Sequence, residues 1–129
     1  MGKIKIALIG FGKMGQEVNN LYKESEIFEV VSVSFKNKSD KLDIEGIKKA
    51  DLAIDFTSKD VVIKNVEAVA KLGKNIVIGT TGWYEHLDEV KKIVDKYQIG
   101  LIYAPNFSIG ANIFIKMAEF SAKLFEKFP

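Results

Sequence analysis

Six residues near the start of the chain have the types and spacing of a dinucleotide-binding loop: Gly10, Phe11, Gly12, Lys13, Met14 and Gly15. In the G-x-G-x-x-G pattern the first glycine allows a tight turn, the second lets a pyrophosphate approach the backbone, and the third lets a helix pack closely on a strand. The start of that helix offers free N–H groups and a partial positive charge to phosphates. The alternative is a glycine-rich turn with no ligand. We favour binding because the pattern follows an apolar run and precedes a helical pattern.

The cofactor preference depends on the residue about 20 positions after this loop, where an acidic side chain would bond the ribose hydroxyls of NAD. The segment 36–39 reads Lys-Asn-Lys-Ser instead. Lys36 and Lys38 carry the charge that attracts a 2′-phosphate, and Asn37 and Ser39 can donate hydrogen bonds, so we predict NADPH as the preferred cofactor with NADH possible. Two alternatives stay open. The lysines could only keep an exposed loop soluble, or Asp40 and Asp43 could reach the ribose.

Two further polar or glycine-rich segments follow apolar runs. In Asp55-Phe56-Thr57, the carboxylate is better explained as a partner of backbone N–H groups, or as a cap of the next helix, than as a catalytic group. Phe56 could instead contact the cofactor. In the segment 79–82, Gly-Thr-Thr-Gly, the glycines allow a flat ligand to approach and the hydroxyls could bond a carboxamide. An ordinary turn with a threonine cap is the alternative. Trp83 and Tyr84 are expected to pack rather than bind.

The last such segment is 104–108, Ala-Pro-Asn-Phe-Ser. Pro105 fixes the turn, Asn106 offers a donor and an acceptor, and Phe107 could line a nicotinamide face. The alternative is a helix start capped by Ser108.

The elements that position these segments follow from the apolar pattern. It predicts strands over residues 4–9, 28–35, 51–56, 75–78 and 99–103, and helices over 13–24, 44–49, 59–72, 84–97 and 109–128. Strands separated by helices predict an α/β fold, a Rossmann-type doubly wound parallel sheet of about five strands with helices on both faces, in one dinucleotide-binding domain over 1–129. The carboxyl ends of such strands share one edge, where ligands bind. The loops that follow the strands are therefore expected to converge.

Composition excludes several other classes. Of 129 residues, 47% are hydrophobic and 28% charged, and the net charge of +2 gives no reason to expect a nucleic acid or a membrane as partner. The chain has no cysteine, which excludes thiolate nucleophiles and cysteine-based zinc sites. His86 is the only histidine and is expected at the surface, so we predict no metal site. The apolar run 6–9 is too short for a signal peptide, which leaves the cytoplasm as the expected location.

Four segments in fixed order resemble the N-terminal domain of the dihydrodipicolinate reductase family: IALIGFGKMGQE, AIDFTSKD, VIGTTGW and APNFSIGAN. The resemblance covers essentially the whole chain. It implies an NAD(P)H-dependent oxidoreductase of the diaminopimelate route of lysine biosynthesis, with a Rossmann-type cofactor domain followed by a substrate domain and usually a tetramer.

The resemblance also implies cofactor contacts residue by residue. Gly10, Phe11, Gly12, Lys13, Met14 and Gly15 would lie at the phosphates, and Lys13 stands where many members have arginine. Lys36 would meet the adenosine ribose and its 2′-phosphate. Phe56, Gly79, Thr80 and Thr81 would line the cleft, and Ala104, Pro105, Asn106 and Phe107 would lie by the nicotinamide.

Family members continue with a His-His motif, a lysine and a PSGT segment, which supply the acid and the contacts to the substrate carboxylates. None of these is present in this chain, so we expect the substrate domain and every catalytic residue to be absent. We expect it to bind the cofactor, to bind substrate only with the missing domain, to be inactive alone and to form no family-like tetramer. Two other interpretations remain: a different NAD(P)-dependent oxidoreductase with the same fold, and a non-catalytic dinucleotide-binding module such as a redox sensor.

Overall fold

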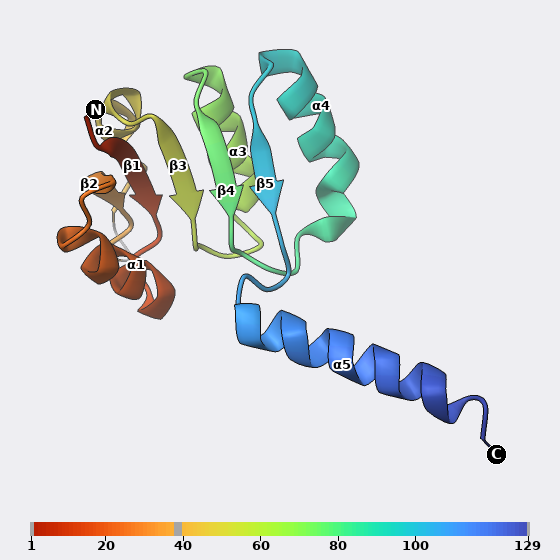
Figure 1. Ribbon diagram of the computed structural model, residues 1–129. Coiled ribbons are helices and arrows are strands. Elements are labelled where there is room, and N and C mark those ends of the chain that lie inside the picture. The colour runs from red at the N-terminus through yellow and green to blue at the C-terminus, as the bar shows by residue number, and fades with distance from the viewer. Residues whose placement is uncertain (1, 38–39, 129) are drawn as a thin grey trace.

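The computed structural model describes residues 2–37 and 40–128 and contains a five-stranded sheet in the order β2-β1-β3-β4-β5 (Figure 1). The strands are β1 (Ile4–Ile9), β2 (Phe28–Ser34), β3 (Leu52–Asp55), β4 (Asn75–Ile78) and β5 (Leu101–Tyr103). All neighbouring strands are parallel, as predicted. The chain leaves β2, crosses β1 and continues at β3. The strand order therefore reverses between β1 and β3, which is the point where doubly wound sheets bind ligands.

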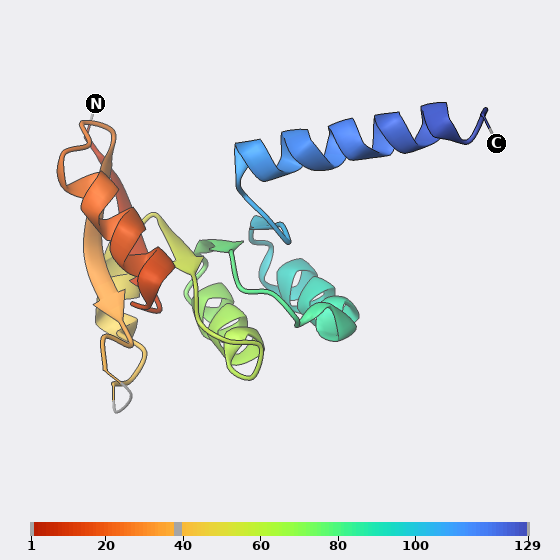
Figure 2. The same cartoon turned by 90° about the horizontal axis from the view of Figure 1, so that it is seen from below.

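Helices cover both faces of the sheet, which confirms the predicted Rossmann-type arrangement (Figures 1 and 2). They are α1 (Lys13–Lys23), α2 (Ile44–Lys49), α3 (Val62–Lys71), α4 (Leu87–Tyr97) and α5 (Ile109–Phe125). Residues of α2, α3 and α4 pack on one face, against a core that contains Ala7, Ile9, Ala53, Ile76 and Ile78. α1 packs on the other face through Val18 and Tyr22, against Ile6, Leu8 and Ile54.

The second face is covered only in part. Alternate residues of a strand point to opposite faces, so Ile54, Val77 and Ile102 face the side of α1. α1 lies over β1 and β2 and leaves the other strands open, and Ile102 is 61% exposed.

Several element boundaries differ from the sequence prediction, and each difference has a local cause. β2 stops before Phe35, because Phe35 has a left-handed backbone with φ of +58°. α3 starts at Val62 instead of residue 59, because the N–H groups of Val61 and Val62 both donate to Ser58 O in a turn. The helix predicted over 84–97 opens with a 3₁₀ turn, η1 (Tyr84–His86).

The other differences between predicted and observed boundaries amount to one to three residues. α1 ends at Lys23 rather than residue 24. β3 spans 52–55 rather than 51–56, although Phe56 N still donates to Ile9 O at 2.8 Å. β5 begins at residue 101 rather than 99, because Gln98 ends α4 in a left-handed conformation and Ile99 N donates back to Val94 O. α5 ends at Phe125, and Phe128 N closes a tighter turn onto Phe125 O.

α5 projects away from the rest of the molecule (Figures 1 and 2). No residue of this helix is buried. The apolar stripe predicted from the sequence is exposed along its whole length; its members are Ile113, Met117, Phe120, Leu124 and Phe128. In the described part of the chain, no helix has the length and apolar character needed to span a bilayer.

Candidate functional site

The glycine-rich loop leaves the end of β1 beside β3. Gly10 has φ of +95°, a conformation that favours glycine, and a Cβ built there would lie 2.6 Å from Phe56 O. Gly15 is buried at the start of α1, and a Cβ there would overlap Gly10 O. These two glycines therefore let the loop, α1 and the end of β3 pack closely together.

Gly12 is different because none of the residues that the structure describes crowds it. It is the N-cap residue of α1, with φ of −71°, and a Cβ built on it has no heavy atom within 4 Å. The start of α1 receives no side-chain cap and has no acidic residue in its first turn. Its first N–H groups therefore face an open, electropositive position, which suits a phosphate.

A first groove, the glycine-loop groove, has a volume of about 510 Å³ and lies beside this loop. Its walls come from the ends of β1, β2 and β3, and the lining residues are Gly10, Phe11, Gly12, Phe35, Lys36, Asn37, Phe56, Thr57, Ser58 and Val61. Lys36 and Asn37 are exposed. The predicted residues Lys38 and Ser39 lie outside the described residues.

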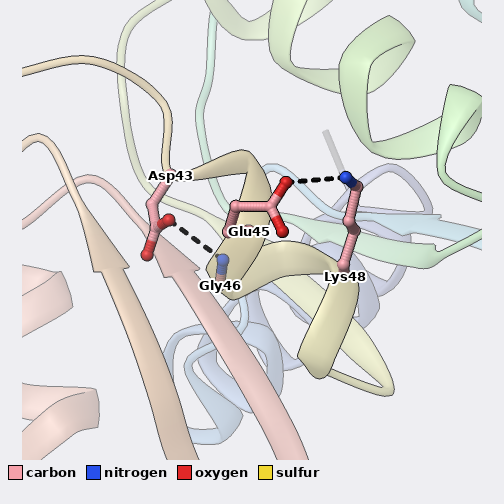
Figure 3. Close-up of polar contacts among 4 residues, drawn as sticks. All are labelled: Asp43, Glu45, Gly46 and Lys48. Atoms are coloured by element: carbon pink, nitrogen blue, oxygen red, sulfur yellow. Dashed lines mark hydrogen bonds and ion pairs between the residues drawn. The ribbon is translucent and has the colours of Figure 1, made fainter.

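The loop that carries Lys36 is fixed at its base by Asp43. The Asp43 carboxylate accepts hydrogen bonds from Gly46 N at 2.9 Å and Ser32 Oγ at 2.7 Å, and the first of these caps α2 (Figure 3). These hydrogen bonds, with Gly46 the largest influence, lower the pKa of the Asp43 carboxyl. On the same helix, Glu45 pairs with Lys48 at 2.6 Å on the surface (Figure 3). Asp43 is thus a helix cap in this structure.

Asp40 has a similar local role. Its carboxylate accepts a hydrogen bond from Asn37 N at 2.8 Å, and Asp40 N donates to Asn37 O. Asp43 is thus bonded to β2 and α2 through both carboxylate oxygens, and Asp40 accepts one hydrogen bond within its loop.

A second groove, the sheet-face groove, has a volume of about 550 Å³ and lies on the part of the sheet that α1 leaves open. Its lining residues are Met14, Val18, Tyr22, Ile54, Phe56, Val77, Gly79, Ala104, Pro105, Asn106, Phe107 and Ser108. Phe56 lines both grooves, and a Cβ built on Gly79 would overlap its ring. Phe56 therefore borders both grooves, at the end of β3.

Four of the predicted cofactor residues line neither groove: Lys13, Gly15, Thr80 and Thr81. Lys13 and Thr81 are exposed, and Gly15 acts through packing. Thr80 is only 6% exposed; its hydroxyl donates to Asp55 Oδ1 at 2.9 Å, and its carbonyl accepts from Trp83 Nε1 at 2.8 Å. Thr80 therefore points into the protein and its hydroxyl proton is not available to a carboxamide. The packing role predicted for Trp83 is confirmed by its complete burial.

Asp55 is completely buried at the end of β3. Its carboxylate accepts hydrogen bonds from Thr57 N at 2.8 Å, Thr57 Oγ1 at 2.7 Å, Thr80 Oγ1 at 2.9 Å and Asn65 Nδ2 at 2.8 Å. Burial raises the pKa of the Asp55 carboxyl, while the hydrogen bonds from Thr57, Asn65 and Thr80 oppose that rise. The predicted partnership with turn N–H groups is confirmed, but Asp55 does not cap α3, whose N-cap residue has no side-chain hydrogen bond.

In the turn before α5, several polar groups form hydrogen bonds with one another. Ser108 Oγ accepts from Ala111 N at 3.2 Å, which confirms the cap predicted as an alternative. Asn106 Oδ1 accepts from Ser108 N at 2.8 Å, so the side-chain oxygen of Asn106 is occupied within the turn.

His86 lies on the surface of η1, as predicted, with Nδ1 3.4 Å from Glu89 and Nε2 3.7 Å from Glu85. Among residues 2–37 and 40–128, no group of histidine and acidic side chains has the arrangement of a metal site.

Sequence reasoning missed the strand residues that line the grooves, namely Ile54 and Val77, together with Val18 and Tyr22 of α1. The alternation along each strand was the available signal, since it assigns Ile54 and Val77 to the face of α1. The hydrogen bonds of Asp55 with Asn65 and Thr80 could not be predicted from the sequence, because the three residues belong to different elements.

Comparison with known proteins places this arrangement in a family. Residues 4–107 match the family model described as dihydrodipicolinate reductase, N-terminus. The chain is 36% identical over 126 residues to 4-hydroxy-tetrahydrodipicolinate reductase of Cutibacterium acnes, which covers 95% of this chain and 50% of the relative. It is 32% identical over 129 residues to the enzyme of the same name from Streptomyces avermitilis, covering 98% and 51%. The chain thus spans about half the length of the curated relatives it matches.

Among solved structures, the chain is similar to a dipicolinate-bound dihydrodipicolinate reductase from Paenisporosarcina sp. TG-14. The TM-score is 0.74 at 29% identity, over 93% of this chain and 54% of that chain.

Proposed function

The chain belongs to the family of dihydrodipicolinate reductase N-terminal domains, and on this premise we propose that it binds a nicotinamide dinucleotide along the carboxyl edge of its sheet, with NADPH preferred to NADH. The observation that carries the proposal is Gly12, which is open to approach at the uncapped start of α1 and at the point where the strand order reverses. A turn without a ligand gives no steric reason for this position to be free of a side chain.

The residues present fit the parts of the cofactor. The pyrophosphate would meet the backbone of Gly12 and the first N–H groups of α1, with Lys13 nearby. The adenosine would lie in the glycine-loop groove against Phe11 and Lys36. The nicotinamide would lie in the sheet-face groove between Gly79 and the segment 104–107, on the far side of Phe56. Gly15, Thr80 and Thr81 would act by shaping the loops.

The preference for NADPH is supported by the charge at the end of β2. Lys36 lines the glycine-loop groove and is exposed. A 2′-phosphate would gain an attraction to Lys36, and the two carboxylates nearest in sequence, Asp40 and Asp43, already accept hydrogen bonds from the protein. An exposed lysine discriminates less than an arginine fork would, so NADH binding is retained.

The names of the relatives lead us to assign the activity to a protein that contains this chain rather than to this chain alone. A bound dihydronicotinamide supplies a hydride, and the domain orients it and keeps water from it. The sheet-face groove suits that role, since its lining is largely apolar and contains one ionisable side chain, Tyr22. We propose that such a protein reduces the 4-hydroxy-tetrahydrodipicolinate class of substrate on the route to lysine. Residues 1–129 alone would bind cofactor without turnover, because the sheet-face groove offers no cationic side chain to hold a dicarboxylate substrate and only Tyr22 as an ionisable proton donor.

The proposal is tested by calorimetric titration of residues 1–129 with NADPH and with NADH at low and moderate salt. We expect both to bind, NADPH about tenfold more tightly, which corresponds to about 1.4 kcal/mol. The difference should shrink as salt screens the exposed lysine. Equal affinities would contradict the preference for NADPH but support the dinucleotide site. If neither cofactor binds, the whole proposal is overturned.

A further inference from the structure

The buried carboxylate of Asp55 joins two loops that face the candidate cofactor site. Asp55 Oδ1 accepts from Thr57 N, Thr57 Oγ1 and Thr80 Oγ1, and Oδ2 accepts from Asn65 Nδ2. The backbone adds a further link, since Gly79 N donates to Asp55 O at 2.9 Å. One side chain thus holds the loop after β3, the loop after β4 and the first turns of α3.

Burying a carboxylate at position 55 costs free energy that a buried apolar residue would not. Asp55 is 0% exposed, and among the described residues no lysine or histidine forms an ion pair with it. Burying a carboxylate without a cation is unfavourable unless hydrogen bonds replace its hydration. An apolar residue of similar size would fill the space more favourably, but it would leave the donors of Thr57, Asn65 and Thr80 without a partner.

A carboxylate is the side chain of this size that accepts on both oxygens. Asparagine at this position would keep an acceptor for Thr57 and Thr80 but would present an NH₂ group to the NH₂ group of Asn65. A carboxylate accepts at both atoms as the network stands, whereas asparagine would require the Asn65 amide to turn over and give up its contact with Thr57 Oγ1.

The loops held in this way are the ones that shape the two grooves. Phe56 lies between Asp55 and Thr57 in sequence and lines both grooves, and Gly79 precedes Thr80 and lines the sheet-face groove. The Phe56 ring leaves no room for a Cβ on Gly79, so a small shift of either loop would change the shape of the sheet-face groove beside Phe56.

We propose that Asp55 is a positioning residue for dinucleotide binding: its carboxylate holds the loops 56–58 and 79–82 at the separation that lets one cofactor occupy both grooves. This inference rests on the proposed function. It predicts that weakening the carboxylate network lowers the affinity for NADPH and NADH by the same factor, because the loops serve parts that both cofactors share.

The test compares Asp55→Asn with the exchange variant Asp55→Asn/Asn65→Asp, using calorimetric affinities for both cofactors and amide hydrogen exchange of Thr57 and Gly79. In the single variant the Asn65 amide must turn over to accept from the new NH₂ group, which gives up its contact with Thr57 Oγ1. In the exchange variant the new amide at position 55 can donate to the new carboxylate at position 65. We expect Asp55→Asn to lower the affinity for both cofactors about tenfold or more and to speed hydrogen exchange at both amides. The exchange variant should recover most of the lost affinity and most of the lost protection. Val90→Ala, a change at the buried residue of α4, is the control that lowers stability without altering affinity.

Thr80→Val serves if Asp55→Asn does not fold, since it removes one donor and keeps the side-chain volume. We expect a few-fold loss of affinity for both cofactors and faster exchange at Gly79. The inference would be overturned if Asp55→Asn and Thr80→Val lower only the stability and leave cofactor affinity and amide hydrogen exchange unchanged. If the wild-type chain binds neither cofactor, the proposed function fails, and the hydrogen exchange alone then decides whether Asp55 holds the loops.

Discussion

At the scale of single residues, the three glycines of the G-x-G-x-x-G loop have three different physical roles. Gly10 adopts a positive φ, Gly15 allows close packing on Gly10 O, and Gly12 alone has open space around it. Sequence spacing was enough to predict these roles because the pattern follows from local geometry. The same kind of reasoning offered the Thr80 hydroxyl as a partner of a carboxamide, but in the structure this hydroxyl donates to Asp55. That partner is 25 residues away in the chain, and local patterns carry no information about it.

Lys36 gives the sharpest residue-scale prediction. Lys36→Glu should abolish the preference for NADPH, because a carboxylate at this position repels the 2′-phosphate and can bond the ribose hydroxyls of NADH. We expect the affinity ratio of NADPH to NADH to fall at least tenfold, measured by calorimetry at low salt. Lys41→Glu is the matched control, since it makes the same charge change on the same loop at an exposed residue that lines neither groove. An equal effect of both substitutions would assign the preference to overall charge and not to Lys36.

At the scale of elements, the sequence predicted the existence and order of the strands and helices, and the correct bounds of β1 and β4. It missed boundaries where a backbone hydrogen bond to a turn decides the outcome, as at Ser58 before α3. It also missed the sheet-face groove. That groove depends on which strands α1 covers, and residue alternation within a single strand does not give that information.

The short helix α2 supplies a prediction at this scale, because its cap Asp43 also anchors the loop of Lys36. Asp43→Ala should lower the free energy of unfolding at neutral pH by about 0.5–2 kcal/mol, as expected for loss of an N-cap. The folded-state pKa of Asp43 is lowered from its usual value of 3.8, so the ionised carboxylate stabilises the fold above that value. This contribution is lost as the pH falls through the lowered pKa of Asp43. The free energies of unfolding of wild type and Asp43→Ala should therefore become similar in acid.

Urea unfolding of both proteins at neutral and at acidic pH measures this difference. Asp43→Asn is the control: it keeps a cap acceptor but has no charge to titrate, so its stability relative to Asp43→Ala should depend little on pH in this range. A constant difference between wild type and Asp43→Ala at all pH values would contradict the assigned ionisation.

At the scale of the whole molecule, a packed sheet domain carries a helix that adds nothing to its core. No residue of α5 belongs to either buried cluster, and Phe114, Phe120 and Phe125 are 71%, 65% and 75% exposed. The apolar period of this helix was visible in the sequence, but the period alone cannot tell whether a partner for the apolar face is present. Sequence patterns predict that a face is apolar, and only the fold shows what covers it.

Deleting residues 109–129 should therefore leave the stability of the sheet domain unchanged. We expect the midpoint of thermal unfolding, followed by circular dichroism, to change by less than about 3 °C, since a loss of 1 kcal/mol would move it by about 4–8 °C in a domain of this size. A larger fall would mean that α5 packs on the domain in solution.

The central claim, that the glycine-rich loop holds a dinucleotide, is tested most directly at Gly12. Calorimetric titration with NADPH should compare wild type, Gly12→Ala and Gly110→Ala. In the last of these, the added Cβ meets nothing closer than Ser108 Oγ at 4.0 Å in α5. We predict that Gly12→Ala keeps the wild-type unfolding temperature but binds NADPH at least tenfold more weakly, because its methyl group takes the space of the pyrophosphate. Gly110→Ala should bind as wild type. Wild-type affinity in Gly12→Ala would contradict the account and leave the loop as a turn without a ligand.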